Sequence, residues 1–362
     1  MAPPFAVAEI LLVSKPLGPP WNDGAKNLVR DLAEASHRYR FRCLVPKGVP
    51  APGGHIAEPI YSGGGQYAPS LLQNLRVLAR LAKPDDVSLY HFFFAPNPKT
   101  SMVASALMKL RRRPTVHTVV SKPSGRPPLF ADVHIALSES TAATLRDLGA
   151  RDVRVIPPGL PLEPPNLGER GLEFRKRMVL TSRRFQPRHQ KPLVLFAGDL
   201  VAGGGARVFA QAAATSKAFH AVFACRPKGA GHAAERAAVQ QIVMDASFMG
   251  QVTDMAALLS VVDVVCLPAT NLLGKMDIPM VLLEALRLGK PVIVSDRPPL
   301  SELDQPGVIQ VEPTAEALRV AIEDLLPATH APTSLSGRYD ILRMAAAYED
   351  IYEELLLGGT KR

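Results

Sequence analysis

The chain has 362 residues, with 42 lysine and arginine residues against 33 aspartate and glutamate residues, and a formal net charge of +9. This length predicts two domains of about 100–200 residues each. A hydrophobic content of 47% with 21% charged residues excludes an intrinsically disordered chain. Cys43, Cys225 and Cys266 are far apart, which excludes a disulfide framework and a cysteine zinc site. We therefore expect a globular protein of a reducing compartment.

The positive charge lies almost entirely in the first half of the chain. Residues 1–170 contain 21 basic and 13 acidic residues, whereas residues 171–362 contain 21 and 20. This asymmetry indicates an anionic partner, which could be a nucleic acid, an anionic lipid or a phosphorylated substrate.

Two apolar stretches need to be distinguished from export or membrane segments. Residues 5–13 are short, contain Glu9 and lack a basic region before them, so they predict a buried first strand. The stretch from Met255 to Leu273 contains Asp263 and Pro268, which favours a helix followed by a buried strand. We therefore expect a soluble, cytoplasmic chain, with peripheral contact at the inner face of a membrane left open.

Short apolar runs alternate with helical patterns, which is typical of parallel sheets covered by helices on both faces. In the first half, strands are expected near 8–13, 40–45, 87–94, 114–120, 132–137 and 153–156. Helices are expected between them near 24–36, 69–82, 99–111 and 140–148. A proline-rich connection over 157–170 and a basic segment from Arg175 to Arg188 then separate the two halves.

The second half repeats the pattern. Its strands are expected at 193–197, 220–225, 262–267, 291–295 and 308–311. Its helices are expected at 206–216, 231–245, 254–261, 279–288 and 314–325, and a final amphipathic helix at 338–357. Two successive doubly wound units would place a ligand between them, where helix N-termini can receive a phosphate.

The segment 254–296 carries the most informative motif. It contains Lys275-Met-Asp-Ile-Pro-Met-Val-Leu-Leu-Glu284, followed by Ala-Leu-Arg-Leu-Gly-Lys-Pro-Val. This pattern resembles the donor-nucleotide segment of GT-B glycosyltransferases, in particular the retaining family 4 group. Supporting matches follow the family's order through most of the chain: Ala136-Leu-Ser-Glu139, Val155-Ile-Pro-Pro-Gly159, Leu195-Phe-Ala-Gly198 and Ala345-Ala-Ala-Tyr-Glu-Asp-Ile-Tyr352.

The resemblance implies an α/β fold of the GT-B type. Two Rossmann-like doubly wound domains would face a central cleft, and the C-terminal helix would cross back to the first domain. The expected parts are an acceptor domain over 1–160, a linker over 161–190, a nucleotide-sugar donor domain over 191–337 and the returning helix over 338–362.

The same resemblance assigns the ribose hydroxyls of the donor to Glu284, since a carboxylate can accept two hydrogen bonds. A solvated surface glutamate is the alternative interpretation. The backbone N–H groups of Met280, Val281 and Leu282 would open the helix toward the diphosphate. Where the family has its first glutamate, eight residues before Glu284, this chain has Met276, so the neighbouring Asp277 is a candidate catalytic substitute.

The two cations with which the family clamps the diphosphate are missing. The family's Gly-Arg-Leu reads Gly198-Asp199-Leu200 here, and Gly204 stands at the lysine position. We expect Arg226, Lys228 and Lys275 to compensate the leaving diphosphate, with Gly198 beside it. Ordinary loop cations are the alternative, and the glycine triplet centred on Gly204 could instead offer backbone amides.

In the first domain, the family's Thr-x-His-Asp pattern is incomplete. Thr118 matches, but Val120 and Ser121 stand where the histidine and aspartate would be. His91, near a predicted strand end, is therefore the catalytic candidate, and a buried, hydrogen-bonded histidine is the competing interpretation. The expected acceptor-side residues are Asn22, Gly24, Asn97 and Thr118.

These observations predict a glycosyltransferase that moves a sugar from a nucleoside-diphosphate sugar to a saccharide or lipid-linked acceptor, such as those of cell-envelope polysaccharide. The resemblance implies retention, no metal, and no cofactor apart from the nucleotide sugar as co-substrate. The three altered motifs leave open a degenerate GT-B protein that binds a nucleotide or a partner without transfer.

The basic first half fits a membrane better than a nucleic acid. Arg111–Arg113 is not accompanied by any nucleic-acid-binding motif, so no nucleic acid is expected. The positive charge has two interpretations: peripheral contact with an anionic membrane, or scattered charge that keeps the protein soluble. The candidate cations for such a contact are Arg38, Arg40, Arg42, Arg76, Arg80, Lys109 and Arg111–Arg113.

Overall fold

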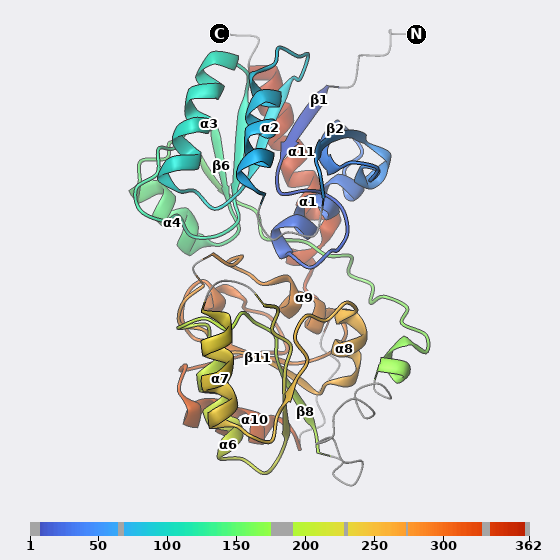
Figure 1. Cartoon of the computed structure of the whole chain (residues 1–362), viewed down its shortest axis with the longest axis vertical. Coiled ribbons are helices and arrows are strands. Elements are labelled where there is room, and N and C mark those ends of the chain that lie inside the picture. The colour runs from blue at the N-terminus through green and yellow to red at the C-terminus, as the bar shows by residue number, and fades with distance from the viewer. Residues whose placement is uncertain are drawn as a thin grey trace. The chain divides into compact units, whose positions relative to one another are not determined.

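The computed structural model describes residues 8–63, 69–174, 191–227, 231–272, 274–327 and 334–358. The chain divides into two compact units, which are described separately (Figure 1). Unit 1 comprises Met1–Pro161, Leu273–Ile278 and Gly337–Arg362, and unit 2 comprises Leu162–Leu272 and Pro279–Ser336. The predicted basic segment from Arg175 to Arg188 lies outside the described residues.

Unit 1 is built on a seven-stranded parallel sheet in the order β3-β2-β1-β4-β5-β6-β7. Its strands are β1 (Glu9–Val13), β2 (Arg40–Pro46), β3 (Ile56–Tyr61), β4 (Leu89–Phe93), β5 (Thr115–Val119), β6 (Val133–Ala136) and β7 (Val153–Val155). Its helices are α1 (Gly24–Ala35), α2 (Leu71–Ala82), α3 (Pro98–Arg111), α4 (Glu139–Asp147) and α11 (Ile341–Gly358), with short 3₁₀ turns at Pro52–Gly54 and Gly337–Tyr339.

The two faces of this sheet are covered by different helices. Side chains alternate between the faces of a strand, and in β4 Tyr90 and Phe92 pack in one core cluster with Leu81 of α2 and Met108 of α3. His91, between them, points to the other face and bonds to α11. That face is covered by α1 and α11, which contact each other. Unit 1 therefore has an α2–α3 face and an α1–α11 face.

The C-terminal helix is fastened to the end of α1. Glu349 of α11 accepts hydrogen bonds from the Ser36 hydroxyl (2.5 Å) and from the backbone N–H groups of His37 and Arg38 (both 2.9 Å). It also pairs with the Arg38 guanidinium at 2.9 Å. The predicted return of the C-terminal helix to the first domain is thus confirmed.

Strand β3 was not among the predicted elements. It contains Pro59, which normally argues against a strand, because proline lacks the N–H that a sheet requires. β3 lies at the edge of the sheet, where one side of the backbone needs no partner, and this is where proline is tolerated.

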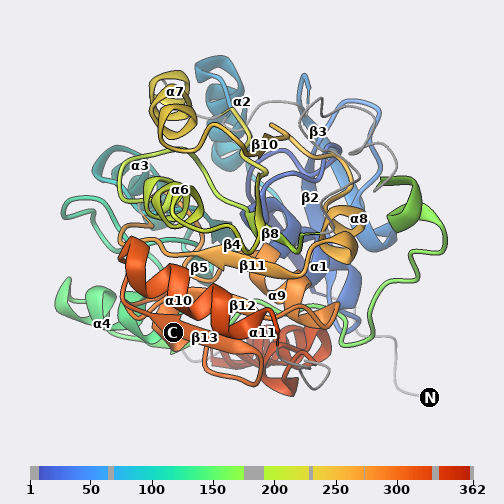
Figure 2. The same cartoon turned by 90° about the horizontal axis from the view of Figure 1, so that it is seen from below.

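Unit 2 is built on a six-stranded parallel sheet in the order β10-β9-β8-β11-β12-β13 (Figure 2). Its strands are β8 (Leu193–Phe196), β9 (His220–Phe223), β10 (Ser247–Phe248), β11 (Val264–Leu267), β12 (Val292–Ser295) and β13 (Val308–Val311). Its helices are α6 (Ala206–Ala214), α7 (His232–Ile242), α8 (Met255–Val261), α9 (Met280–Arg287) and α10 (Ala315–Leu325), with a 3₁₀ turn at Leu300–Glu302. The prediction of an α/β protein with two doubly wound units is confirmed.

Candidate functional site

The strand order of unit 2 marks one point of its sheet. β8 and β11 are neighbours at the centre; the chain proceeds outward from β8 to β10 on one side and from β11 to β13 on the other. In open parallel sheets, ligands bind beyond the carboxyl ends of the strands at such a switch point. The segments that follow β8 and β11 therefore form the candidate site of unit 2.

A glycine-rich turn after β8 lies against the segment after β11. The Gly203 backbone oxygen accepts hydrogen bonds from the N–H groups of Thr270 (2.9 Å) and Asn271 (3.0 Å). Gly203 and Gly205 have φ values of 73° and 91°, and a Cβ at Gly205 would lie 2.8 Å from the Pro268 backbone oxygen. Glycine is required at both positions, so the predicted triplet brings the start of α6 close to the end of β11.

Among the described residues of unit 2, three helices, α6, α7 and α9, begin without a side-chain cap, and two of them, α6 and α9, follow the switch-point strands β8 and β11. α6 follows Gly205 and α9 follows Pro279, and neither residue offers a side-chain acceptor to the first turn. By contrast, α8 and α10 are capped by Asp254 and Thr314. First-turn N–H groups have no intrahelical acceptor and attract anions together with the helix dipole. The starts of α6 and α9 are therefore suited to a phosphate.

Arg226 lies at the same edge. It follows β9, the neighbour of β8, and its Nε donates to the Asp199 carboxylate at 3.1 Å. Asp199 is buried and the Arg226 side chain is 21% exposed. Asp199 thus holds an arginine from the segment that follows the neighbouring strand. The second predicted cation of this segment, Lys228, lies outside the described residues.

The remaining donor candidates lie on or near α9. Glu284 is half-buried, one turn after the start of this helix. The Leu282 N–H donates to the Pro279 backbone oxygen at 3.0 Å and is therefore a poor phosphate donor. For the N–H groups of Met280 and Val281, phosphate binding stays a prediction. Gly198 lies two residues after β8, and a Cβ added at this position would lie 2.7 Å from the Phe196 ring, so a side chain has no room there.

The segment with Lys275 and Asp277 groups with unit 1, although the residues on both sides of it belong to unit 2. Asp277 is 2% exposed and accepts a 2.6 Å hydrogen bond from the hydroxyl of Ser138, the N-cap of α4. Lys275 is half-buried. Asp277 therefore joins its segment to α4, and its catalytic role stays a prediction.

His91 and Thr118 occupy the interior of unit 1 rather than a substrate surface. Both are fully buried. The His91 ring bonds through Nδ1 to the Tyr352 hydroxyl (2.6 Å) and through Nε2 to Thr118 Oγ1 (2.7 Å), and Thr118 also contacts the Tyr348 hydroxyl at 3.2 Å. Burial lowers the pKa of His91 well below its usual value. The structure thus corrects both predictions: these residues attach α11, and no atom of theirs is exposed to a substrate.

The other predicted acceptor-side residues lie at helix starts that follow β1 and β4, the central pair of the unit 1 sheet. Asn97 caps α3, accepting from the Thr100 N–H at 3.0 Å. Gly24 is the first residue of α1, and Asn22 is half-buried beside it. The cap of α1 is Asp23, which also pairs with Lys15 at 2.8 Å.

Two searches of the described residues gave negative results. Across the described ranges, no group of three or more histidine, cysteine, aspartate or glutamate side chains is placed to hold a metal ion. Nor does any helix among them combine the length and the apolar composition needed to cross a membrane.

Comparison with protein families decides the identity of both units. Residues 24–164 match the model described as Glycosyltransferase Family 4, and residues 191–327 match the model described as Glycosyl transferases group 1. The chain belongs to the group 1 glycosyltransferases. A search of curated protein sequences gives no significant match.

Solved structures similar to this glycosyltransferase share its fold over nearly the whole chain. HepE from Anabaena, solved in complex with UDP-glucose, superposes with a TM-score of 0.73 at 17% identity, covering 96% of this chain and 100% of that one. Sucrose-phosphate synthase from Thermosynechococcus elongatus gives a TM-score of 0.71 at 19% identity, covering 97% and 100%. At these identities the likeness establishes the GT-B fold, as predicted.

Two features of the glycosyltransferase were missed from the sequence. Asp199 was taken only as a lost arginine, although its partner Arg226 was itself a candidate. Ser138 caps α4 through the Thr141 N–H, and its second bond, to Asp277, has no signal in the sequence. Both pairs join residues that are distant in sequence, and no local pattern reports such a contact.

Proposed function

We propose that this glycosyltransferase moves a sugar from a nucleoside-diphosphate sugar to a saccharide or lipid-linked acceptor, with retention and without a metal ion. The observation that carries the proposal is the switch point of unit 2, where the uncapped starts of α6 and α9 and the Asp199–Arg226 pair lie at one sheet edge. The complexes of HepE with UDP-glucose and with UDP support a nucleotide sugar as the donor.

Each group has a distinct role in the proposed donor complex. The first-turn amides of α6 and α9 bind diphosphate oxygens. Arg226 has five N–H donors, of which Nε is fixed by Asp199, so the guanidinium is held in orientation as it faces the developing negative charge. Glu284 accepts two hydrogen bonds from the ribose hydroxyls.

Retention follows if the acceptor approaches on the face from which the diphosphate departs. The acceptor oxygen bonds to the anomeric carbon as the bond between that carbon and the phosphate oxygen breaks, and the acceptor proton passes to the departing diphosphate. Catalysis is then mainly positional and electrostatic, so no protein nucleophile is required.

The test is nucleotide binding and donor turnover with Glu284→Ala. Loss of two charge-assisted hydrogen bonds is expected to weaken nucleoside-diphosphate binding about 100-fold. Glu316→Ala, on the exposed side of α10, is the matched control and is expected to bind like the wild type. Comparing thermal unfolding with UDP, GDP and ADP identifies the base, because only a nucleotide that binds raises the midpoint of thermal unfolding.

The competing function, a GT-B protein that binds without transfer, predicts a different pattern. Nucleotide stabilisation without turnover of any UDP-, GDP- or ADP-sugar would favour it, and the absence of both would overturn the donor site. Product anomers read by NMR test retention, and turnover that disappears with EDTA would overturn metal independence.

The proposal extends to the cellular setting. A lipid-linked acceptor lies at a membrane surface, so the enzyme would work in the cytoplasm in peripheral contact with the inner face of an anionic membrane. An acceptor of cell-envelope polysaccharide fits this setting, and comparing free with lipid-linked saccharide acceptors in the same assay tests it.

A further inference from the structure

The outer surface of the α2–α3 face of unit 1 is unusually apolar. Leu71 is 78% exposed, Leu75 52% and Met102 63%. Among the described residues thirteen large hydrophobic side chains are exposed, and six of them lie on these two helices. The six are Leu71, Leu72, Leu75, Met102, Val103 and Leu110.

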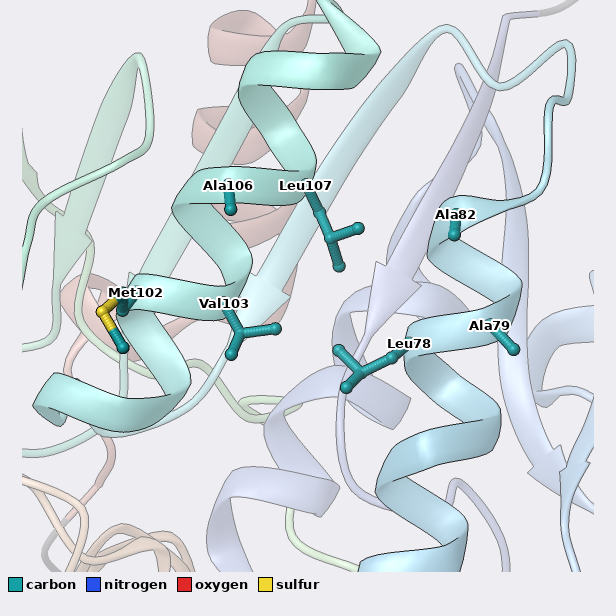
Figure 3. A pocket seen from close by; sticks show the side chains of 7 residues that line it. All are labelled: Leu78, Ala79, Ala82, Met102, Val103, Ala106 and Leu107. Atoms are coloured by element: carbon teal, nitrogen blue, oxygen red, sulfur yellow. The ribbon is translucent and has the colours of Figure 1, made fainter.

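Two of these side chains, Met102 and Val103, line a groove between the two helices (Figure 3). Its volume is about 560 Å³, and every lining residue belongs to α2 or α3: Leu78, Ala79, Ala82, Met102, Val103, Ala106 and Leu107. Leu71, Leu75 and Leu78 follow one another at helical spacing, which places them on one side of α2. The exposed leucines and the groove are therefore one continuous apolar surface.

The same surface is basic and almost free of acids. Neither α2 nor α3 contains an aspartate or glutamate, and residues 69–113 hold eight lysine or arginine residues against two aspartates. Asp85 pairs with Arg80 and with Arg111, which leaves Asp86. The exposed cations at the ends and sides of the helices are Arg76, Lys83, Lys99, Lys109, Arg112 and Arg113.

Other arginines of the basic first half are used inside the fold. Arg38 pairs with three carboxylates of α11, at Glu349, Asp350 and Glu353. Arg42 pairs with Glu9 and with Glu58. The nine cations that the sequence suggested for a membrane contact therefore do not act as one group, and the charge concentrates around α2 and α3.

We propose that the α2–α3 surface docks on an anionic phospholipid bilayer, with the exposed leucines and Met102 inserted at the headgroup boundary and the surrounding cations on the lipid phosphates. Apolar insertion combined with a basic cluster is what reversible binding to an anionic membrane requires. The absence of acids on both helices matches a uniformly negative surface. The proposal locates the membrane contact of the proposed function, but it rests on this surface alone and not on sugar transfer.

The test is sedimentation of the full chain with vesicles, in the absence of nucleotide sugar and acceptor. Binding is expected to phosphatidylcholine vesicles that contain phosphatidylglycerol, to weaken at high salt, and to be much weaker on phosphatidylcholine alone. The double variant Leu75→Gln/Met102→Gln is expected to lose at least tenfold in partitioning. Arg76→Gln/Lys109→Gln is expected to lose about 25-fold, since each cation near the surface contributes about fivefold.

Matched controls replace exposed apolar and basic residues elsewhere in the described chain. Val320→Gln/Leu342→Gln controls for the apolar pair, and Arg146→Gln/Arg297→Gln for the basic pair. Both are expected to bind like the wild type. Failure of the wild type to bind anionic vesicles at low salt, or equal losses in test and control variants, would overturn the proposal. So would a dimer that Leu75→Gln/Met102→Gln dissociates, because the surface would then be an interface between copies.

The vesicle and donor experiments fail independently. Vesicle binding by a chain that turns over no nucleotide sugar would overturn the transferase function and keep the surface. Turnover with soluble acceptors, without any vesicle binding, would overturn the membrane-docking surface and keep the transferase function.

Discussion

The two faces of the unit 1 sheet differ in how the buried histidines His91 and His134 are bonded. On the α1–α11 face, His91 uses both ring nitrogens, with Tyr352 and Thr118 as partners. On the α2–α3 face, neither nitrogen of the buried His134 has a hydrogen-bond partner within the described residues, and the outer helix surface is apolar.

The first face is built to hold a distant segment of the chain in place. The second face bonds Tyr61, Tyr90 and His117 within unit 1 and attaches no C-terminal helix. The proposed membrane contact would account for its exposed apolar residues.

The first prediction targets the attachment of α11. Glu349→Ala is expected to lower the free energy of unfolding of unit 1 by about 3 kcal/mol. It leaves the Ser36 hydroxyl and two backbone N–H groups without their acceptor and removes the most buried of the three carboxylates that pair with Arg38. Urea denaturation followed by circular dichroism measures this. Glu353→Ala, which removes an exposed partner of the same arginine, is the control and is expected to cost under about 1 kcal/mol.

The pH dependence of the same contact has a definite sign. Burial alone would raise the pKa of Glu349, but hydrogen bonds from Ser36 and Arg38 outweigh it, so the pKa lies below its usual value. The stabilisation is therefore present above the unfolded-state pKa and is lost as the pH falls through the folded-state value. Equal costs for Glu349→Ala and Glu353→Ala would show that the buried contact of Glu349 does not hold α11 to the end of α1.

The second prediction concerns the unpartnered histidine of the α2–α3 face. Burial lowers the pKa of His134 to about 4, against a small opposing effect of Asp152 and Asp132. The unfolded chain binds a proton below about pH 6.5, so stability is lost as the pH falls from there toward the folded-state pKa. Between pH 7 and pH 5 this residue is expected to account for about 2 kcal/mol of lost stability.

His134→Leu tests the origin of that loss. Urea denaturation at pH 7 and at pH 5 is expected to show a smaller difference for the variant than for the wild type, by about 2 kcal/mol. If the wild type and the variant lose the same stability between pH 7 and pH 5, protonation of His134 on unfolding is not the cause of the loss.

Much of the fold could be predicted because short apolar runs report strands that are buried on both faces. Strands and helices of both halves lie within a few residues of the predicted ranges, and the exceptions have local causes. β3 contains Pro59, and β10 has only the two residues Ser247–Phe248, too few for a periodic pattern. Strand order, by contrast, is not encoded in any window of sequence.

The candidate site could be predicted where the backbone conformation alone requires a particular residue type. Gly203 and Gly205 need positive φ, and their triplet stands out in the sequence. His91 was misjudged because its role depends on Tyr352, far away on α11. The Asp199–Arg226 contact likewise exists only because β8 and β9 are neighbours. Local chemistry can be read from sequence, but pairings made by topology cannot.

The smallest expected effect is the change in the free energy of unfolding when exposed apolar residues of the α2–α3 face are replaced. Leu75→Gln/Met102→Gln is expected to change the free energy of unfolding by no more than about 0.5 kcal/mol, because both side chains are largely exposed and little apolar contact is lost. Replacing a buried leucine with a polar residue would lower the free energy of unfolding several times more. Leu81 of α2, which packs in the core cluster, is such a residue. A thermal melt without lipid measures this. A loss of 2 kcal/mol or more would mean that the two side chains support the fold, and the apolar surface would then need no external partner to explain it.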